Sequence, residues 1–113
     1  MTQITSHVLD TSIGKPAEGI QITLSQQSAD TWTVLGSAKT NSDGRVGDFT
    51  GNDNPLAAGI YKLSFSLRDY YEQSKTASFY PHADVVFEIE GNGQHCHVPL
   101  LLNPFGYSTY RGS

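Results

Sequence analysis

Hydrophobic and polar residues alternate strictly along three stretches of the chain. The apolar positions are Ile20, Ile22 and Leu24 in the first stretch, Tyr61, Leu63, Phe65 and Leu67 in the second, and Val85, Phe87 and Ile89 in the third. A period of two places successive side chains on opposite faces of a strand. Each stretch therefore predicts a strand with one buried face.

Turn-forming clusters separate these strands. They read "SIGKPAEG", "NSDGR", "GNDNPLAAG" and "EGNGQ", and they are rich in residues that tolerate tight or left-handed backbone. Strand after turn predicts an all-β, antiparallel β-sandwich. Residues 68–75 break the pattern, because they include good helix formers and neither glycine nor proline. We expect a short helix there, linking two strands across the sandwich.

The segment "HCHVPLLL" places two histidines on one side of a strand. Cys96, Val98, Leu100 and Leu102 share one face, whereas His95, His97, Pro99 and Leu101 share the other. The first row is apolar and should face the core, so His95 and His97 should face outward. The same alternation in "ITSHVLD" turns Val8 inward and His7 outward. Two strands thus present imidazoles on outer faces.

Pro99 and Leu101 add a second expectation for this outward face. Proline cannot donate a hydrogen bond to a strand ladder, which predicts an edge or a bulge at Pro99. Leu101 is an apolar residue that a monomer would leave in contact with water. Both features indicate a subunit interface.

The composition narrows the class of protein. The chain has 113 residues, enough for a single domain with a real core, and its formal charge of −4 argues against nucleic acid and anionic membranes as partners. The single cysteine, Cys96, excludes an intrachain disulfide. The N-terminal segment has no signal-peptide pattern and no stretch is long enough to span a bilayer, so we expect a cytoplasmic protein.

Histidine is the most informative candidate for chemistry. His95 and His97, with His7, offer three imidazoles for a metal, although Cys96 between them points the other way and a structural zinc site needs four ligands. Arg45 follows the "NSDG" turn, where Asp43 and Gly44 are explained by the turn itself. There is no nucleophile elbow, phosphate-binding loop or dinucleotide fingerprint. The pattern alone indicates a β-sandwich with outward histidines.

Several stretches together resemble a known family. They are "SHVLDTSIGKPAEGIQITL", "KTNSDGRV", "GIYKLSF", "YYEQSKTASFYPHADVVFEI" and, above all, "HCHVPLLLNPFGYSTYRGS". The chain resembles the transthyretin-like family from about residue 4 to residue 113, and the ending "YRGS" is typical of its enzyme branch, 5-hydroxyisourate hydrolase. The stretches "HVLD" and "GKPA" mark the wider superfamily.

The resemblance implies a fold and an activity. Residues 1–113 would form one transthyretin-like (prealbumin-like) domain of two four-stranded sheets with one short helix. Four copies would form a homotetramer with active sites at the dimer–dimer interface. The activity would be hydrolysis of 5-hydroxyisourate to 2-oxo-4-hydroxy-4-carboxy-5-ureidoimidazoline in urate degradation, without a cofactor or metal.

The resemblance also implies site residues. The catalytic residues would be His7, Arg45 and His97, and the tail residues Tyr110, Arg111, Gly112 and Ser113 would bind substrate. The tail would form a wall of the pocket, with Gly112 permitting a sharp turn of the backbone. Cys96 stands where the family commonly has tyrosine, and its inward position predicts an effect on stability more than on chemistry.

Three questions stay open at this point. Either His97 or His7 would take a proton from water, and Arg111 would either bind substrate or anchor the tail. A carrier of small ligands would use the same channel without catalysis. A metal-dependent hydrolase built on His7, His95 and His97 is the other alternative.

Overall fold

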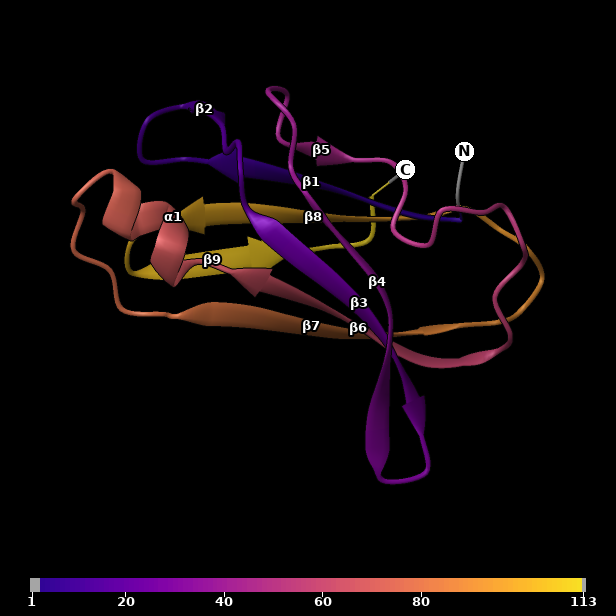
Figure 1. The fold of residues 1–113 in the computed structure, drawn as a ribbon. Coiled ribbons are helices and arrows are strands. Elements are labelled where there is room, and N and C mark those ends of the chain that lie inside the picture. Colours follow the sequence, from indigo (N-terminus) through magenta and orange to yellow (C-terminus); the bar gives the residue numbers. More distant parts are fainter. Residues whose placement is uncertain (1–2, 113) are drawn as a thin grey trace.

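The computed structural model describes residues 3–112. The elements in chain order are β1 (Ile4–Asp10), β2 (Lys15–Pro16), β3 (Gln21–Ser28), β4 (Thr31–Lys39), β5 (Arg45–Val46), β6 (Gly59–Ser66), α1 (Arg68–Gln73), β7 (His82–Ile89), β8 (Cys96–Asn103) and β9 (Gly106–Thr109). The strands form two stacked sheets, with α1 at one end of the sandwich (Figure 1). The predicted β-sandwich with one short helix is confirmed.

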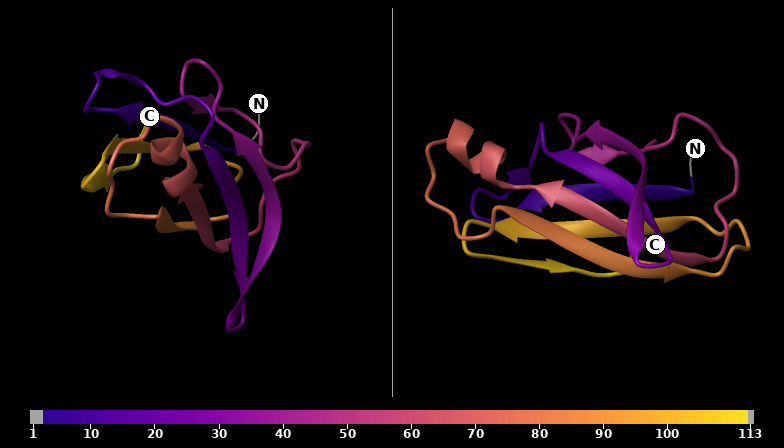
Figure 2. Two further views of the ribbon diagram at one scale, coloured as in Figure 1. Left: turned by 60° about the vertical axis from the view of Figure 1, so that its left-hand side comes forward. Right: turned by 60° about the horizontal axis from the view of Figure 1, so that its bottom comes forward.

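The two sheets differ in size. One has the strand order β4-β3-β6-β7, as expected for a four-stranded sheet. The other has the order β2-β1-β8-β9, and the two-residue strand β5 joins it as a second antiparallel partner of β1, which makes five strands. Figure 2 shows the two layers from further directions, with the β3–β4 hairpin extending beyond the rest of the sandwich.

One strand pair departs from the predicted antiparallel pattern. β1 and β8 run parallel, with Ile4 opposite Cys96 and Thr5 opposite His97, whereas the other strand pairs of residues 3–112 are antiparallel. Parallel neighbours cannot be joined by a hairpin and need a long crossover. Here the crossover is most of the chain, which leaves β1, runs through the other sheet and returns in β8.

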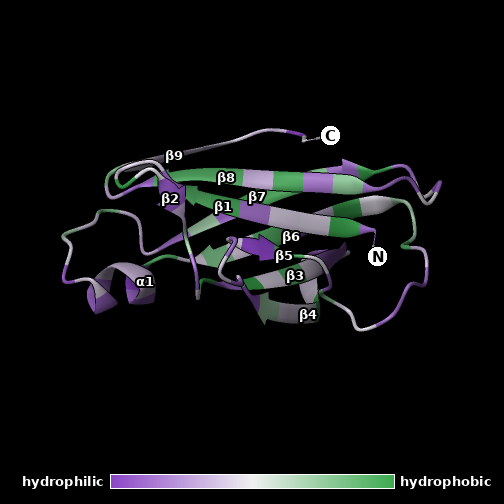
Figure 3. Ribbon diagram, turned by 90° about the horizontal axis from the view of Figure 1, so that it is seen from above, coloured by the Kyte–Doolittle hydropathy of each residue, from purple (hydrophilic) through white to green (hydrophobic). Residues whose placement is uncertain are grey.

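The core lies between the sheets and consists of the predicted inward rows. Ile20, Ile22, Leu24, Tyr61, Leu63, Phe65, Leu67, Ile89, Val98, Leu100 and Leu102 are all buried. Cys96, Val85 and Phe87 are partly buried and pack against this core. Along β1 and β8, hydrophobic and hydrophilic bands alternate in Figure 3. The alternation read from the sequence is therefore confirmed.

The structure differs from the sequence-based predictions at the helix and at Pro99. α1 ends at Gln73, two residues before the predicted end, and Lys75 just beyond it has a φ of 54°. The helix connects β6 and β7, which are neighbours in one sheet, so the predicted link across the sandwich is wrong. At Pro99 an edge or a bulge was predicted; β8 lies between β1 and β9, so it is not an edge strand, and the β1–β8 register passes through Pro99 without a shift.

Candidate active site

Three neighbouring strands, β5, β1 and β8, bring the predicted residues to one face. His7 is opposite Arg45 in the β1–β5 pair, and Thr5 is opposite His97 in the β1–β8 pair. Residues opposite one another on neighbouring strands share a face of the sheet, and so do residues two apart on one strand. His7 is partly exposed and Val8 is buried, which confirms the predicted direction of both side chains.

A tight turn presents Arg45 to this face. The side-chain oxygen of Asn41 accepts hydrogen bonds from the backbone N–H groups of Asp43 and Arg45, at 2.9 and 3.0 Å. Gly44 has a φ of 73°, and its carbonyl accepts a hydrogen bond from Val8 N–H at 2.8 Å. A side chain at Gly44 would collide with the Val8 carbonyl. The turn is thus held against β1 by backbone contacts that require glycine.

Between these strands lies an open pocket of about 240 Å³, called here the histidine–arginine pocket. Its lining residues are Thr5, Ser6, Arg45, Val46, Gly47, His95 and His97. His7 is not among them and lies on the same face beside Arg45. The pocket therefore combines imidazole and guanidinium groups on a sheet surface.

Thr5 contacts two histidines: His97 in β8, and His95, the residue just before that strand. Its hydroxyl oxygen is 2.8 Å from Nδ1 of His97 and 2.9 Å from Nε2 of His95. The two imidazole rings are stacked at a centroid distance of 6.4 Å. His95 and His97 thus share one face, as the alternation predicted, and one buried hydroxyl group contacts both.

Electrostatics favour neutral imidazoles in this site. Burial, and then the charge of Arg45, lowers the pKa of His97 below the usual 6.5, and His7 and His95 act in the same direction when they are protonated. Burial, followed by the Arg45 charge, also lowers the pKa of His7, whereas Asp43 acts in the opposite direction. Desolvation and neighbouring cations both disfavour the charged form of histidine. Both rings are therefore neutral near pH 7 and able to accept a proton.

The C-terminal tail contacts His97 through Gly112. The backbone N–H of Gly112 donates to the His97 carbonyl at 2.8 Å, forming an isolated bridge beyond the end of β9. A Cβ atom on Gly112 would lie 2.6 Å from Cδ2 of His97. Gly112 does not have a positive φ, so close packing on the imidazole, rather than the expected sharp turn, explains the glycine.

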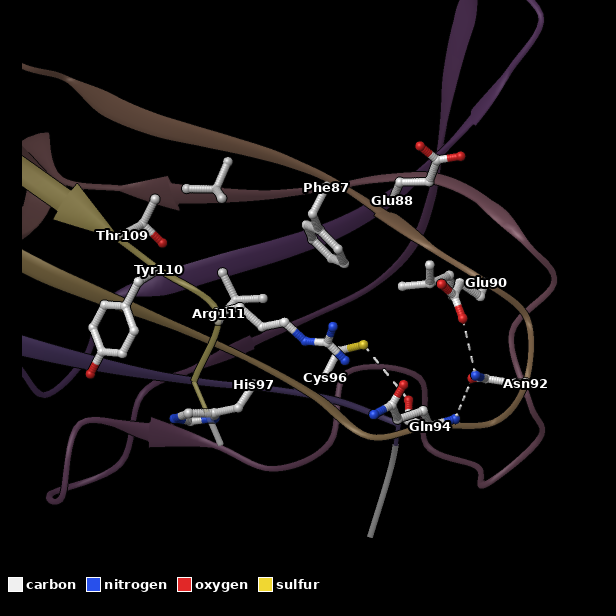
Figure 4. A pocket seen from close by; sticks show the side chains of 13 residues that line it. Phe87, Glu88, Glu90, Asn92, Gln94, Cys96, His97, Thr109, Tyr110 and Arg111 are labelled. Carbon is white, nitrogen blue, oxygen red and sulfur yellow. Dashed lines mark hydrogen bonds between the residues drawn. The ribbon is translucent and has the colours of Figure 1, made fainter.

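The other tail residues line a second cavity, on the side of β8 that faces β7. This inter-sheet cavity measures about 200 Å³ and is bordered by residues of β7, β8 and the tail, including Phe87, Glu88, Cys96, His97, Tyr110 and Arg111 (Figure 4). The guanidinium of Arg111 points toward Cys96 and Gln94 in this view, away from His97. His97 borders both cavities. The fourth predicted tail residue, Ser113, lies outside the described residues.

The fourth histidine of the chain, His82, is not among the residues that line the histidine–arginine pocket. His82 is the first residue of β7, and its Nε2 lies 3.7 Å from the Asp84 carboxylate on the surface. Within residues 3–112, no cluster of three or more histidine, cysteine, aspartate or glutamate side chains is arranged to hold a metal ion. The same range contains no helix that is long and apolar enough to cross a membrane.

Thr5 is the residue of this site that sequence reasoning missed. It lies two positions before His7, so the same alternation that turned His7 outward also applied to Thr5. Its partner could not be read from the sequence, because the contact depends on the parallel register between β1 and β8. Hydroxyl residues two positions from a candidate histidine are the signal that was available.

Comparison with known proteins places the chain in a family. Residues 4–112 match the HIUase/Transthyretin family. The sequence is 49% identical, over 110 residues, to a probable 5-hydroxyisourate hydrolase of Caenorhabditis elegans, covering 97% of this chain and 81% of that protein. The chain belongs to the HIUase/Transthyretin family.

Solved structures of both branches of the HIUase/Transthyretin family share the fold. The 5-hydroxyisourate hydrolase of Klebsiella pneumoniae matches with a TM-score of 0.85 and 36% identity, covering 97% of this chain and 98% of that one. Sea bream transthyretin in complex with thyroxine matches with a TM-score of 0.90 and 28% identity, covering 97% and 94%. The backbone is thus common to both branches, and only the side chains can separate them.

Proposed function

We propose that this chain catalyses the hydrolysis of 5-hydroxyisourate to 2-oxo-4-hydroxy-4-carboxy-5-ureidoimidazoline, a step of urate degradation in purine catabolism. The observation that carries the proposal is the grouping of His7, Arg45 and His97 on one sheet face, in a chain 49% identical to a probable 5-hydroxyisourate hydrolase. The reaction class is hydrolysis of a cyclic amide C–N bond.

The reaction sets three requirements for the site. A water molecule must lose a proton as it attacks the acyl carbon, the carbonyl oxygen must be stabilised as negative charge develops on it, and the ring nitrogen must gain a proton as the C–N bond breaks. Histidine suits the proton transfers because its pKa lies near working pH. A fixed cation or N–H donor suits the oxyanion.

We assign these tasks from the geometry of the pocket. His97 lines the histidine–arginine pocket together with Arg45, whereas His7 lies beside it. His97 takes a proton from water and holds it at Nε2. It then donates this proton to the departing ring nitrogen of the substrate. Arg45 binds the carbonyl oxygen. His7, neutral because of burial and Arg45, orients the substrate by a hydrogen bond.

The tail contributes to the same site in this proposal. Gly112 packs on the His97 ring and its N–H holds the tail on β8. Tyr110, Arg111 and Ser113 are assigned to substrate binding. Tyr110 and Arg111 border the cavity on the other side of His97, so their contact with substrate requires that the substrate, or the tail of another copy, extend around the ring.

A homotetramer with sites at its dimer–dimer interface is part of the proposal. β7 and β9 each lie at one edge of their sheet within residues 3–112, and edge strands can pair with another copy. Val86 on β7 is 56% exposed and Tyr110 beyond β9 is 57% exposed, which leaves apolar surface near both edges. We also propose a cytoplasmic location, in accord with the free thiol of Cys96.

The runner-up function is a non-catalytic carrier of small ligands. The observation in its favour is the fold it shares with sea bream transthyretin bound to thyroxine. An apolar ligand in the histidine–arginine pocket would leave the two imidazoles and Arg45 without hydrogen-bond partners. Each buried polar group left unpaired costs roughly 1–3 kcal/mol, so the pocket favours a polar substrate.

The decisive experiment follows the decay of freshly generated 5-hydroxyisourate by ultraviolet absorbance. We expect the untagged protein to accelerate the decay, with and without a strong chelator, and His97→Ala to remove the acceleration. His82→Ala is the matched control, because it removes an exposed histidine on another strand and should leave the rate unchanged. No acceleration over spontaneous decay would overturn the proposal in favour of the carrier, and loss of activity with chelator would favour a metal-dependent hydrolase.

A further inference from the structure

The Thr5 hydroxyl is almost enclosed at the centre of the proposed site. Thr5 is 8% exposed. Its hydroxyl oxygen lies 2.8 Å from Nδ1 of His97 and 2.9 Å from Nε2 of His95. The parallel register places Thr5 directly opposite His97, so the strand pairing itself fixes this contact. Nothing in the catalytic assignments above uses this hydroxyl.

The number of protons limits how these three groups can be arranged. A hydroxyl group has one hydrogen to donate and can accept two hydrogen bonds, and a neutral imidazole carries a proton on only one of its nitrogens. If both contacts are hydrogen bonds, Thr5 can donate to one ring at most. The other ring must then bring its own proton to the threonine oxygen. The tautomers of His95 and His97 are therefore coupled through Thr5.

The contacts of the His97 ring leave one nitrogen for the pocket. Nδ1 faces Thr5, and Cδ2 faces Gly112 on the opposite side of the ring. Nε2 is the ring nitrogen that remains, and because His97 lines the pocket we assign Nε2 to the substrate or water there. Nε2 is basic only when the proton of the neutral ring is on Nδ1.

The charge that develops during the reaction favours one of the two directions. When Nε2 takes a proton from water, His97 becomes an imidazolium with N–H on both nitrogens. If Nδ1–H already donates to Thr5, that bond persists and becomes stronger, because one partner is now charged. If Thr5 instead donated to a bare Nδ1, Nε2 would carry the proton at rest and could not accept one.

We propose that Thr5 is a positioning residue that holds His97 in the tautomer with Nδ1 protonated and Nε2 bare, by accepting Nδ1–H and donating its own proton to Nε2 of His95. The proposal rests on the hydrolytic function proposed above. His95 then contributes indirectly, as the acceptor that orients the threonine hydroxyl. This arrangement gives a general base oriented by a second group and a third.

Other charged groups near His97 must be kept constant in a test of this idea. His7 on β1, Arg45 on β5 and His95 before β8 all act on the His97 charge. From the tail, Tyr110 and Arg111 border the cavity on the far side of the ring, with Cys96, Glu88 and Glu90. Substitutions at Thr5 leave every one of these groups in place.

Two variants separate the hydroxyl from the shape of Thr5. Thr5→Val keeps the branched shape and removes the hydroxyl, whereas Thr5→Ser keeps the hydroxyl. Because general base catalysis contributes roughly 100-fold to 10,000-fold, a partial loss of the correct tautomer should lower kcat of Thr5→Val about 10-fold to 100-fold with little change in KM. Thr5→Ser should recover kcat to within about threefold of the wild type.

The pH profile reports the direction of the hydrogen bond. Loss of the acceptor for Nδ1–H destabilises the imidazolium more than the neutral ring, which lowers the pKa of His97. Thr5→Val should therefore move the acidic limb of kcat/KM to lower pH. A shift to higher pH would mean that Thr5 donates to His97, and it would overturn the proposal. Thr11→Val is the matched control, because the Thr11 hydroxyl donates to the Leu102 carbonyl at 3.0 Å and contacts no histidine.

A measurement without substrate keeps the two proposals distinguishable. Nitrogen-15 NMR of histidine-labelled wild-type protein at neutral pH reports which nitrogen of each ring carries the proton. We expect His97, identified by the loss of its signals in His97→Ala, to have a protonated Nδ1 and a bare Nε2, with a mixture of tautomers in Thr5→Val. A wild-type His97 protonated on Nε2 would refute the role of Thr5 even if hydrolysis occurs. The expected tautomer in a protein without hydrolase activity would instead refute the proposed function.

Discussion

The contact between Gly112 and His97 makes a quantitative prediction about the tail. In Gly112→Ala, the new Cβ atom would lie 2.6 Å from Cδ2 and 3.3 Å from Cγ of His97. Ordinary contacts between carbon atoms are about 3.5–4.0 Å, so the ring and the tail must separate by about 1 Å. A misplacement of about 1 Å at a reacting group can cost about 100-fold in rate.

We therefore expect kcat/KM of Gly112→Ala to fall about 100-fold, which corresponds to about 2.7 kcal/mol of transition-state stabilisation. The two ways of relieving the collision differ in their kinetics. A displaced His97 ring lowers kcat, because the base is out of position. A displaced tail breaks the hydrogen bond from Gly112 N–H to the His97 carbonyl and raises KM, because residues assigned to substrate binding leave the site.

The assay is the initial rate of 5-hydroxyisourate decay, corrected for spontaneous decay, over a range of substrate concentrations. The matched control is Gly106→Ala in β9, where the nearest atoms to a new Cβ are those of the Asn103 side chain, at 3.6 and 3.7 Å. This control should keep kcat/KM within about twofold of the wild type, and thermal unfolding should show that both variants fold. Equal activity of Gly112→Ala and Gly106→Ala would refute the reasoning.

Three further predictions test the role of Arg45, the protonation of His97 and the stability of the fold. Arg45→Lys keeps the charge but loses the planar fork of donors, so kcat should fall about 100-fold to 1000-fold, and a change in KM alone would contradict the oxyanion role. Because burial and Arg45 lower the pKa of His97, and a base must be deprotonated, the acidic limb of kcat/KM should have its midpoint below pH 6.5; a pH–rate profile with a higher midpoint would count against His97 as the base. Tyr70→Phe removes the hydroxyl that donates to the buried Asp10 at 2.8 Å, so urea denaturation should show a free energy of unfolding lower by about 1.5–3 kcal/mol, with kcat/KM retained. A large fall in kcat/KM of the folded variant would mean that Tyr70 also acts on the site.

The buried face of each strand could be predicted from the sequence, because the alternation of side chains between the two faces of a strand is a local property. Val8 is buried and His7 is partly exposed for the same reason, since neighbours on a strand face opposite ways. The pairing of strands is not local. The parallel register of β1 with β8 joins residues 92 positions apart in the case of Thr5 and His97, and no nearby turn specifies it. The contacts of Thr5 were missed for that reason.

The glycine of the tail shows the same limit from another side. Glycine in a chain end is commonly explained by an unusual backbone angle, which was the expectation for Gly112. Its actual reason is the imidazole ring that occupies the space a side chain would need. A sequence can show that a position is small, but the neighbour that requires it to be small appears only when the tail is placed on β8.

The central position of β8 explains how one imidazole can be held on two sides. Its parallel neighbour β1 supplies Thr5 to Nδ1 of His97, and the antiparallel tail beyond β9 supplies Gly112 to Cδ2. On an edge strand, one of these neighbours would be missing and the ring could turn about its bond to Cβ. Pro99 does not conflict with this position, because the pairing with the tail has a gap between Leu100 and His97, where Thr109 instead donates its hydroxyl to the Pro99 carbonyl at 2.7 Å. The orientation of the proposed base thus depends on residues near both ends of the chain, and it exists only when β1 and the tail are both in place.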